Sequence, residues 1–262
     1  MDLIVSDLDN SILYNNRISL DDIRSIKEWY IQGNIFTIAT GRPLQRVEKI
    51  LEQLDIVFPV ILLNGALVYE KDFGIKTIKH IGEKRVLEFF DLLLAFCALK
   101  NCVLYYPDEI VLLNPDKQLQ DKMHEWELDY ICVESLQKVV AKDLIMITIY
   151  SPDYELQKNI DFIATKFNIG SCNEKYIDII PDNINKGVAL EHVLKQHQFN
   201  EIYIIGDSFS DVSMKSENNF FAVVENANED IKAEADIFIP SFKENPVSSL
   251  INMIRRIDNE SI

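Results

Sequence analysis

The sequence predicts an α/β protein: a parallel β-sheet flanked by helices, with an α+β module inserted into it. Short apolar runs alternate with stretches of helical periodicity, and several of these runs end in small or polar residues, as buried parallel strands do. The runs are LIVSD, IFTIAT, VILLNG, IYIIGD and FFAVV. Between residues 82 and 181 the order of predicted strands and helices becomes less regular. We therefore predict a Rossmann-like core of residues 1–81 and 182–262, with residues 82–181 as the inserted module.

Helices are expected to connect the first apolar runs. Ser19, with Asp22 three residues later, resembles a capping box, and Gly33 supplies a C-terminal stop, so residues 19–32 are predicted to be helical. Pro43 stands where the first residue of the next helix would lie. The apolar face of that helix is formed by Val47, Ile50, Leu51 and Leu54.

The inserted module has its own elements. A helical pattern runs from Glu83 through Leu99, and the aromatic side chains on it are predicted to be core: Phe89, Phe90 and Phe96. The runs VLYYP, EIVLLN and DLIMITIY predict strands, and a second helix is expected near residues 154–167. The α/β rhythm resumes at Asn185 with a helix to His197, followed by the strand IYIIGD and two further helical stretches.

The charge balance argues against several classes of partner. The chain has 262 residues, with 42 Asp and Glu against 26 Lys and Arg, and a formal net charge of −16. A surface that binds a nucleic-acid backbone or an anionic membrane needs a basic stripe, and none stands out. We therefore expect a small-molecule partner, with no nucleic acid and no membrane. An anionic substrate would need local cations or a metal ion to overcome the overall field.

Cysteine usage and the N-terminus favour a reduced, cytoplasmic compartment. Cys97, Cys102, Cys132 and Cys172 show no C-x-x-C spacing, so neither a zinc site nor a disulfide framework is indicated. The opening MDLIVSDLDN lacks the basic stretch of a secretory signal. The longest uncharged run, residues 56–69, is shorter than the ~20 residues of a membrane span.

Residues that end the apolar runs are expected to form the functional site, because ligands of open α/β sheets bind at the carboxyl ends of the strands. In chain order these positions carry Asp7, Asp9, Ser11, Thr40, Asn64, Gly65, Asp207 and Asp211. The carboxylates would repel one another by several kcal/mol at an effective dielectric constant of about 20, unless cations are also present. A divalent metal ion and Lys186 would supply that positive charge.

Magnesium is the metal that this residue set predicts. Carboxylate, carbonyl and water oxygens, without His or thiolate, are the hard ligands that Mg²⁺ prefers, and this ion often shares its site with a substrate phosphate. The small residues Ser11, Thr40 and Gly65 leave room and donors for a tetrahedral anion, and Thr40 leads into a predicted helix whose free N–H groups attract negative charge. Together these features predict a phosphoryl-transfer site.

The ordered segments DLDNS, IATGR, NKG and GDSFSD resemble the four motifs of haloacid dehalogenase-like (HAD) phosphatases. The module between the second and third motifs resembles the C2-type cap of the Cof-like sugar-phosphatase subfamily. Each motif is weak by itself, but four in this order on the expected elements are specific. The resemblance spans nearly the whole chain.

The resemblance implies roles for the site residues. Asp7 would be the nucleophile that forms an aspartyl-phosphate, and Asp9 would act as general acid and then as general base. Mg²⁺ would be held by the Asp7 carboxylate, the Asp9 backbone carbonyl and the Asp207 carboxylate, with Asp211 in support. Thr40 and Lys186 would hold phosphate oxygens. The remaining phosphate-side candidates are Ser11, Gly41, Arg42, Asn64 and Gly65.

Two positions depart from the family pattern. The D-x-D pair is commonly followed by Gly-Thr, where this chain has Asn10 and Ser11, and the last motif usually ends Asn-Asp, where it has Ser210 and Asp211. Asn tolerates positive φ and Ser keeps a hydroxyl, so the first change is mild. Ser210 is shorter than Asn, which leads to the hypothesis of reduced turnover or a shifted substrate range.

Several other polar and aromatic residues have a simpler structural interpretation. The histidines His80, His124, His192 and His197 show no metal spacing and are expected at the surface or an interface. Asp178 and Asp182 could touch substrate, but a solvated linker is favoured. The orientation of Arg42 and Arg46, toward the site or toward solvent, stays open. One of Tyr105 and Tyr106 is a candidate for lining the pocket.

The sequence therefore predicts a Mg²⁺-dependent phosphatase that acts on small phosphomonoesters, with the module of residues 82–181 as a cap over the site. By resemblance, sugar phosphates lead the substrates, and pyridoxal phosphate, nucleotides and other small organophosphates stay open. Phosphoryl transfer to a sugar hydroxyl, as in phosphomannomutases, is an alternative, and so is a binding module that grips a phosphorylated ligand without turnover. A phospho-acceptor domain resembling bacterial receivers is disfavoured by the cap and the D-x-D pair.

Overall fold

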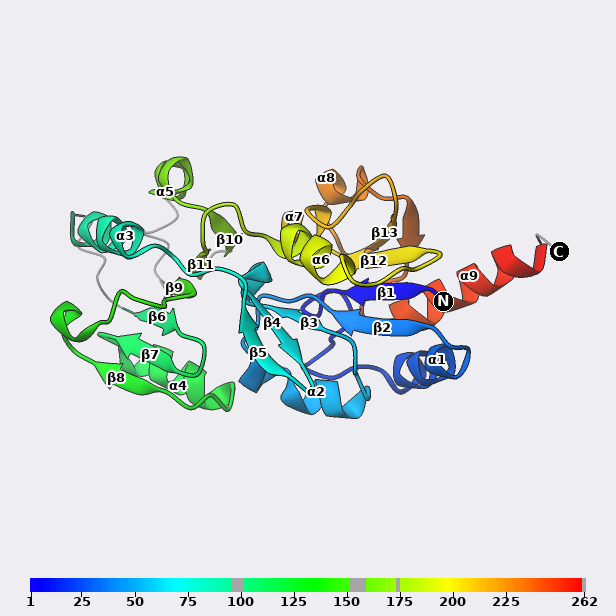
Figure 1. Ribbon diagram of the computed structural model, residues 1–262, viewed down its shortest axis with the longest axis horizontal. Coiled ribbons are helices and arrows are strands. Elements are labelled where there is room, and N and C mark those ends of the chain that lie inside the picture. Colours follow the sequence, from blue (N-terminus) through cyan, green and yellow to red (C-terminus); the bar gives the residue numbers. More distant parts are fainter. Residues whose placement is uncertain (96–100, 151–158, 173–174, 261–262) are drawn as a thin grey trace.

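The computed structural model describes residues 1–95, 101–150, 159–172 and 175–260, which form three β-sheets with flanking helices (Figure 1). Phe96, Cys97 and the predicted helix start at Tyr154 lie outside the described residues. No helix in the described ranges is both long enough and apolar enough to cross a lipid bilayer.

The first sheet is parallel, as predicted. Its strands are β1 (Leu3–Ser6), β2 (Ile35–Ile38), β12 (Ile202–Gly206), β13 (Phe220–Val224) and β14 (Ile237–Ile239), in the order β14-β13-β12-β1-β2. Each neighbouring pair is parallel. The short strand β14 was not expected from the sequence. This arrangement is the α/β fold that the alternation of apolar runs predicted.

The α-helices outside the segment 82–181 are, among the described residues, α1 (Leu20–Ile31), α2 (Glu48–Gln53), α6 (Lys186–Leu194), α7 (Phe209–Val212), α8 (Glu229–Lys232) and α9 (Pro246–Glu260). Ser19 caps α1 by accepting a hydrogen bond from the Asp22 N–H at 2.9 Å. The Asp22 carboxylate, which would complete the predicted capping box, instead accepts a hydrogen bond from the Ser248 N–H of α9 at 2.8 Å. Asp22 therefore ties α1 to α9.

The third apolar run and the helix predicted to begin at Pro43 differ from expectation. Strand β3 (Val60–Leu62) pairs antiparallel with β4 (Leu67–Glu70), which pairs with β5 (Gly74–Thr77). Beyond the end of β2, β3 meets the parallel sheet at a parallel bridge between Ala39 and Ile61. A short buried apolar run has the same pattern in a parallel and in an antiparallel sheet, so the sequence does not distinguish the two kinds of sheet. Pro43 precedes a three-residue 3-10 turn at Leu44–Arg46 instead of opening a longer helix.

The second sheet is mixed and lies wholly within the segment 82–181. Its strands are β6 (Cys102–Tyr105), β7 (Ile110–Leu113), β8 (Ile131–Val133), β9 (Met146–Tyr150), β10 (Ile169–Cys172) and β11 (Tyr176–Ile179), in the order β10-β11-β9-β6-β7-β8. Helices α3 (Glu83–Ala95) and α5 (Ile160–Lys166) pack on one face and α4 (Lys117–Glu125) on the other. Figure 1 shows this sheet on one side of the molecule and the parallel sheet on the other. The domain boundaries at residues 82 and 181 stay a prediction.

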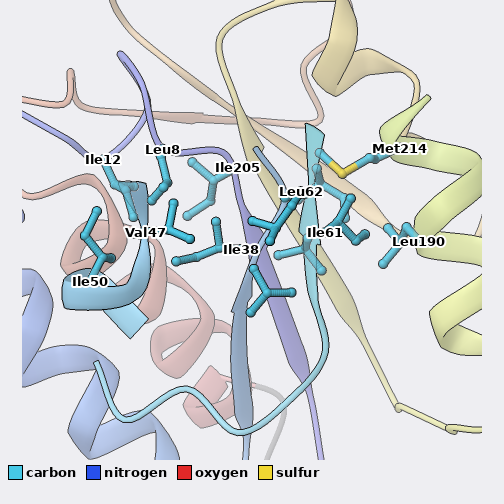
Figure 2. Packing of buried hydrophobic residues seen from close by; sticks show 14 of the residues in the cluster. Leu8, Ile12, Ile38, Val47, Ile50, Ile61, Leu62, Leu190, Ile205 and Met214 are labelled. Carbon is cyan, nitrogen blue, oxygen red and sulfur yellow. The ribbon is translucent and has the colours of Figure 1, made fainter. Parts of the chain in front are cut away.

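The hydrophobic core holds the backbone around the predicted site. Buried side chains from β1, β2, β3, α6, β12 and the segments around them pack together, and each contributes about 1.5–3 kcal/mol by leaving water. Figure 2 shows the packing of Leu8, Ile12, Ile38, Val47, Ile50, Ile61, Leu62, Leu190, Ile205 and Met214. The predicted apolar face of Val47, Ile50, Leu51 and Leu54 is buried, which confirms that part of the sequence analysis.

Candidate active site

The parallel register brings the ends of β1, β2 and β12 to one edge. Ser6 lies opposite Ile205 in the ladder, and the Asp7 N–H donates to the Ile205 carbonyl at 2.9 Å. Asp207 leaves β12 beside Asp7 for this reason. Thr40, which follows β2, leaves the same edge on the other flank of β1. The convergence predicted from the strand ends is therefore present for these three side chains.

Three carboxylates gather at this edge. Carboxylate oxygens of Asp7, Asp207 and Asp211 all lie within 4.8 Å of one another. Asp7 and Asp211 are buried, and Asp207 is partly buried. Asp9, the fourth predicted member, is not in this cluster and pairs with Arg42 instead. The cluster would repel itself strongly in a buried site without positive charge nearby.

Lys186 supplies part of that charge. It is the first residue of α6, it is 2% exposed, and its Nζ donates to Asp7 Oδ1 and to Asp211 Oδ1, each at 2.7 Å. Burial acts to lower the pKa of Lys186, but the charges of Asp211 and Asp7 outweigh it and leave the pKa above its ordinary value. The ammonium group therefore stays charged throughout the physiological pH range.

Asp211 organises the loop that follows β12. Its Oδ1 accepts from Lys186, and its Oδ2 accepts from the N–H groups of Asp207 (3.1 Å) and Ser208 (3.0 Å) and from the Ser208 hydroxyl (2.7 Å). Gly206 makes room for this arrangement, because a Cβ there would lie 2.3 Å from the Asp211 Cβ. Both oxygens of Asp211 are thus engaged, which suits a positioning residue better than a metal ligand.

Asp7 and Asp207 have the chemistry of a divalent-cation site. Burial raises the pKa of Asp7 well above its ordinary value despite the opposing charge of Lys186, and burial together with the charge of Asp211 raises the pKa of Asp207 to about 7. Asp7 Oδ2 accepts no hydrogen bond from the residues that the structure describes, and Asp207 accepts one, from the Ser11 hydroxyl at 3.3 Å. A bound divalent cation would favour the ionised form of both, so the donor set fits a metal with hard oxygen ligands.

Arg42 holds the Asp9 carboxylate in a two-point contact. Its Nε donates to Asp9 Oδ2 at 2.7 Å and its Nη2 to Asp9 Oδ1 at 2.5 Å, while Nη2 also reaches Asn16 Oδ1 at 3.0 Å. Arg42 is 6% exposed, whereas the Asp9 side chain is 54% exposed. Partial burial acts to raise the pKa of Asp9, but the hydrogen bonds and charge of Arg42 outweigh it and lower the pKa. Arg42 therefore points toward the site and not toward solvent, an orientation that the sequence left open.

The loops after β2 and β3 are locked together. The Asn64 N–H donates to the Thr40 carbonyl at 3.1 Å, and the Thr40 hydroxyl accepts from the Arg42 N–H at 3.2 Å. Gly65 has a φ of +100°, and a Cβ there would lie 2.1 Å from the Asn185 carbonyl oxygen. Gly65 thus lets the loop pack against the start of α6, beside Lys186. Gly41 packs on the Asn64 side chain, where a Cβ would lie 3.0 Å from the amide atoms.

Asp178 was expected in a solvated linker, and this expectation is wrong. Asp178 belongs to β11 and is buried, and its carboxylate accepts from the Thr148 hydroxyl at 2.5 Å and from Asn64 Nδ2 at 3.3 Å. Burial raises its pKa to about 7. No local pattern marks Asp178, because its partner Asn64 is 114 positions away. Asp182, in contrast, is exposed and paired with Arg85.

Asn10 and Ser210, which depart from the family pattern, each have a defined local geometry. Asn10 has a φ of 60°, a region that Asn enters more easily than most residues, and its carbonyl accepts from Asn226 Nδ2 at 2.8 Å. The Ser210 hydroxyl lies 2.8 Å from the Ser208 hydroxyl and makes no hydrogen bond to a carboxylate among the described residues. The four histidines are exposed, as expected.

Comparison with known proteins assigns the family. A family model described as haloacid dehalogenase-like hydrolase matches residues 4–251. The 5-amino-6-(5-phospho-D-ribitylamino)uracil phosphatase YwtE of Bacillus subtilis is 24% identical, with 97% of this chain and 98% of the relative covered.

Two solved structures share the fold. TM0651 from Thermotoga maritima superposes with a TM-score of 0.80 at 22% identity, covering 96% of each chain. The HAD subclass IIB sugar phosphatase BT4131 superposes with a TM-score of 0.81 at 20% identity, covering 97% of this chain and 99% of that one. From the family match along nearly its whole length, on a site of the expected composition, we conclude that the chain belongs to the haloacid dehalogenase-like hydrolases.

Proposed function

We propose that this protein is a Mg²⁺-dependent phosphatase that hydrolyses small phosphomonoesters through an aspartyl-phosphate on Asp7. The observation that carries the proposal is the buried contact of Lys186 with Asp7 and Asp211, with Asp207 in the same carboxylate cluster. This set offers a nucleophile, a fixed cation and oxygen ligands for a metal at the edge of a parallel sheet, where ligands of such folds bind. The family match and the phosphatase names of its relatives support the same activity.

In the first step, an Asp7 carboxylate oxygen attacks phosphorus and the bond between phosphorus and the leaving oxygen breaks. Asp9 gives a proton to the leaving alkoxide. In the second step, water attacks the phosphorus of the aspartyl-phosphate, Asp9 takes a proton from that water, and Asp7 is released with inorganic phosphate. Splitting a slow hydrolysis in two, with general acid–base help of about 10²–10⁴-fold, is the benefit of this arrangement.

Asp9 must be protonated for the first step, although Arg42 keeps it ionised in the unliganded site. A phosphate dianion would compete for the Arg42 guanidinium and bring negative charge close to Asp9. Both changes raise the pKa of Asp9. Substrate binding would therefore favour protonated Asp9, which can act as an acid. Before substrate binds, the contact with Arg42 would hold the Asp9 carboxylate in position.

Asp7 and Asp207 would hold the metal ion, together with the Asp9 backbone carbonyl, while Asp211 keeps the loop and Lys186 in place. When bound, Mg²⁺ supplies positive charge that offsets the carboxylates and the charge developing on the phosphoryl oxygens. Thr40 and Lys186 would orient those oxygens, and Ser11, Gly41, Asn64 and Gly65 would shape the pocket around them. Lys186 contributes without a proton transfer, because its pKa lies above the ordinary range.

The substrate class proposed is a phosphorylated sugar or sugar-like metabolite, with the segment 82–181 as the cap that covers it. Among the relatives, YwtE is named for a ribitylamino-uracil phosphate and BT4131 for sugar phosphates. The Asn64 to Asp178 contact supports a cap that meets the catalytic loops directly. Water is the proposed acceptor.

A panel of phosphomonoesters assayed with Mg²⁺, and again with EDTA, tests this function. Turnover that needs the metal and is lost in Asp7→Asn, but kept in the exposed control Asp21→Asn, supports it. Tight binding of a phosphorylated ligand without hydrolysis would support the binding module instead. A phosphorylated isomer of the substrate as product, without free phosphate, would support a mutase.

A further inference from the structure

Arg46 stands at the boundary between the two parts of the molecule. It is the last residue of the 3-10 turn after the Thr40 loop, and it is partly buried. Its guanidinium carbon lies 4.3 Å from the ring centroid of Trp126, which follows α4 of the second sheet. This cation–π contact holds the guanidinium over the ring without using its N–H donors. Arg46 is therefore oriented by one part of the chain while its backbone belongs to the other.

The Arg46 guanidinium forms no salt bridge with a carboxylate among the residues that the structure describes. Arg42, Arg85 and Arg255, the other arginines that are not fully exposed in the described part of the chain, each pair with a carboxylate. The Arg46 side chain makes no hydrogen bond or ion pair with any residue that the structure describes. Burial and the like charge of Arg42 lower the pKa of Arg46 to about 10, so the group remains charged at neutral pH. A partly buried guanidinium whose donors are not used by carboxylates can bind an anion through two parallel hydrogen bonds.

Arg46 follows the Thr40 loop and Arg42 in the chain, and Arg42 holds Asp9. The charge of Arg46 interacts with Asp9 and Arg42 of the catalytic edge, and with Tyr105 and Tyr176 of the second sheet. Asp9 is the residue proposed to protonate the leaving oxygen, whereas Lys186, which contacts Asp7 and Asp211, is proposed to hold the phosphoryl group. An anion bound by Arg46 would therefore belong to the part of the substrate beyond the scissile bond.

We propose that Arg46, held on the Trp126 ring, binds a second anionic group in the leaving portion of the substrate. The preferred substrates are then phosphomonoesters whose leaving group carries a carboxylate or a second phosphate, ahead of neutral sugar phosphates. This inference rests on the proposed phosphatase function and refines its substrate class. A chain with a net charge of −16 needs such a local cation to hold a doubly anionic ligand.

Matched substrate pairs test the proposal: glucose 6-phosphate against 6-phosphogluconate for a carboxylate, and fructose 6-phosphate against fructose 1,6-bisphosphate for a phosphate. The wild type should prefer the more anionic member of at least one pair, and the pair identifies the anion. Arg46→Gln should lower kcat/KM for that member by about ten- to hundredfold, mainly through KM, and change the neutral member by less than about threefold. Arg46→Lys should restore part of the preference, and the exposed Arg256→Gln should change neither member.

Equal losses for both members in Arg46→Gln would assign Arg46 a structural role and overturn the proposal, as would an unchanged preference. Calorimetric binding of the same pairs to Asp7→Asn, with and without Arg46→Gln, gives a readout that does not depend on turnover. If the wild type hydrolyses none of the compounds but Asp7→Asn binds the anionic members more tightly through Arg46, the phosphatase function fails and the anion site stands. If no pair shows a binding preference, the anion site fails by itself.

Discussion

Asn64 Nδ2 donates a hydrogen bond of 3.3 Å to the carboxylate of Asp178, and so joins a loop of the catalytic edge to a buried strand of the second sheet. The same amide packs on Gly41, next to Thr40. A shift of β11 would therefore move the backbone at Thr40 and Gly41, which is proposed to hold phosphate. The contact gives the second sheet a direct mechanical connection to the active site.

The raised pKa of Asp178 predicts a dependence of stability on pH. Its pKa is about 7 in the folded chain because of burial, against an ordinary value of 3.8. Between these values the folded state binds more protons than the unfolded state, so Asp178 lowers the free energy of unfolding as pH rises through this range. Asp178→Asn keeps an acceptor for Asn64 and removes the titration. Relative to wild type, it should gain stability from pH 5 to pH 8 by on the order of 3 kcal/mol, measured by urea unfolding.

Asp207 titrates in the same range, but it is present in both proteins and cancels in that comparison. The control is Asp121→Asn on the exposed face of α4, which should show a constant difference from wild type across the pH range. A constant difference for Asp178→Asn as well would show that Asp178 is already ionised at pH 5.

Lys186→Met should both inactivate and destabilise the protein. It leaves the Asp7 and Asp211 carboxylates buried without their cation, and breaking a buried ion pair in this way costs about 3–5 kcal/mol. Urea unfolding in EDTA should report the full loss, and Mg²⁺ should recover part of it by binding the same carboxylates. The exposed Lys195→Met is the control and should change stability by less than about 0.5 kcal/mol. A Lys186→Met protein as stable as wild type in EDTA would mean that the carboxylates are neutral.

Gly65→Ala should disturb the catalytic edge from a distance. Its φ of +100° disfavours any side chain, and the new Cβ would lie 2.1 Å from the Asn185 carbonyl, which must then move together with the start of α6. We expect a loss of stability of about 2–3 kcal/mol and a large fall in kcat, because Lys186 follows Asn185. Gly74→Ala separates the two causes, since Gly74 has a φ of +76° with nothing within 4 Å of a Cβ. It should cost about 1 kcal/mol and leave kcat unchanged, and equal effects of the two substitutions would contradict the packing argument.

Arg42→Gln should move the limb of the pH profile on which kcat/KM falls as Asp9, the proposed general acid, loses its proton. Arg42 lowers the pKa of Asp9 in the free enzyme, so its removal leaves the effect of burial unopposed and raises that pKa. The limb assigned to free Asp9 should therefore shift to higher pH, and KM should rise because Arg42 is proposed to meet the phosphate. The measurement is kcat/KM from pH 4 to pH 8, with the exposed Arg17→Gln as a control that leaves the profile in place. An unshifted limb would show that Asp9 is not the group that titrates.

The sequence identifies the parts of the site that depend on strand ends. Asp7, Thr40 and Asp207 each follow a buried parallel strand, and the parallel register necessarily brings such positions to one edge. The position of β3 in a separate antiparallel sheet could not be predicted, because a three-residue apolar run carries no directional information. The roles of Asp178 and Arg46 were also hidden, since their partners Asn64 and Trp126 are distant in sequence and meet only after the two parts of the chain have packed.

Whether Asp7 takes up the phosphoryl group is measured most directly by quenching the enzyme in acid during turnover and determining the masses of its peptides. The peptide that contains Asp7 should carry one phosphoryl group during turnover, lose it as substrate is exhausted, and never carry it in Asp7→Asn. Rapid hydrolysis with an unmodified Asp7 peptide, or with the phosphoryl group on another residue, would contradict the role of Asp7 as nucleophile.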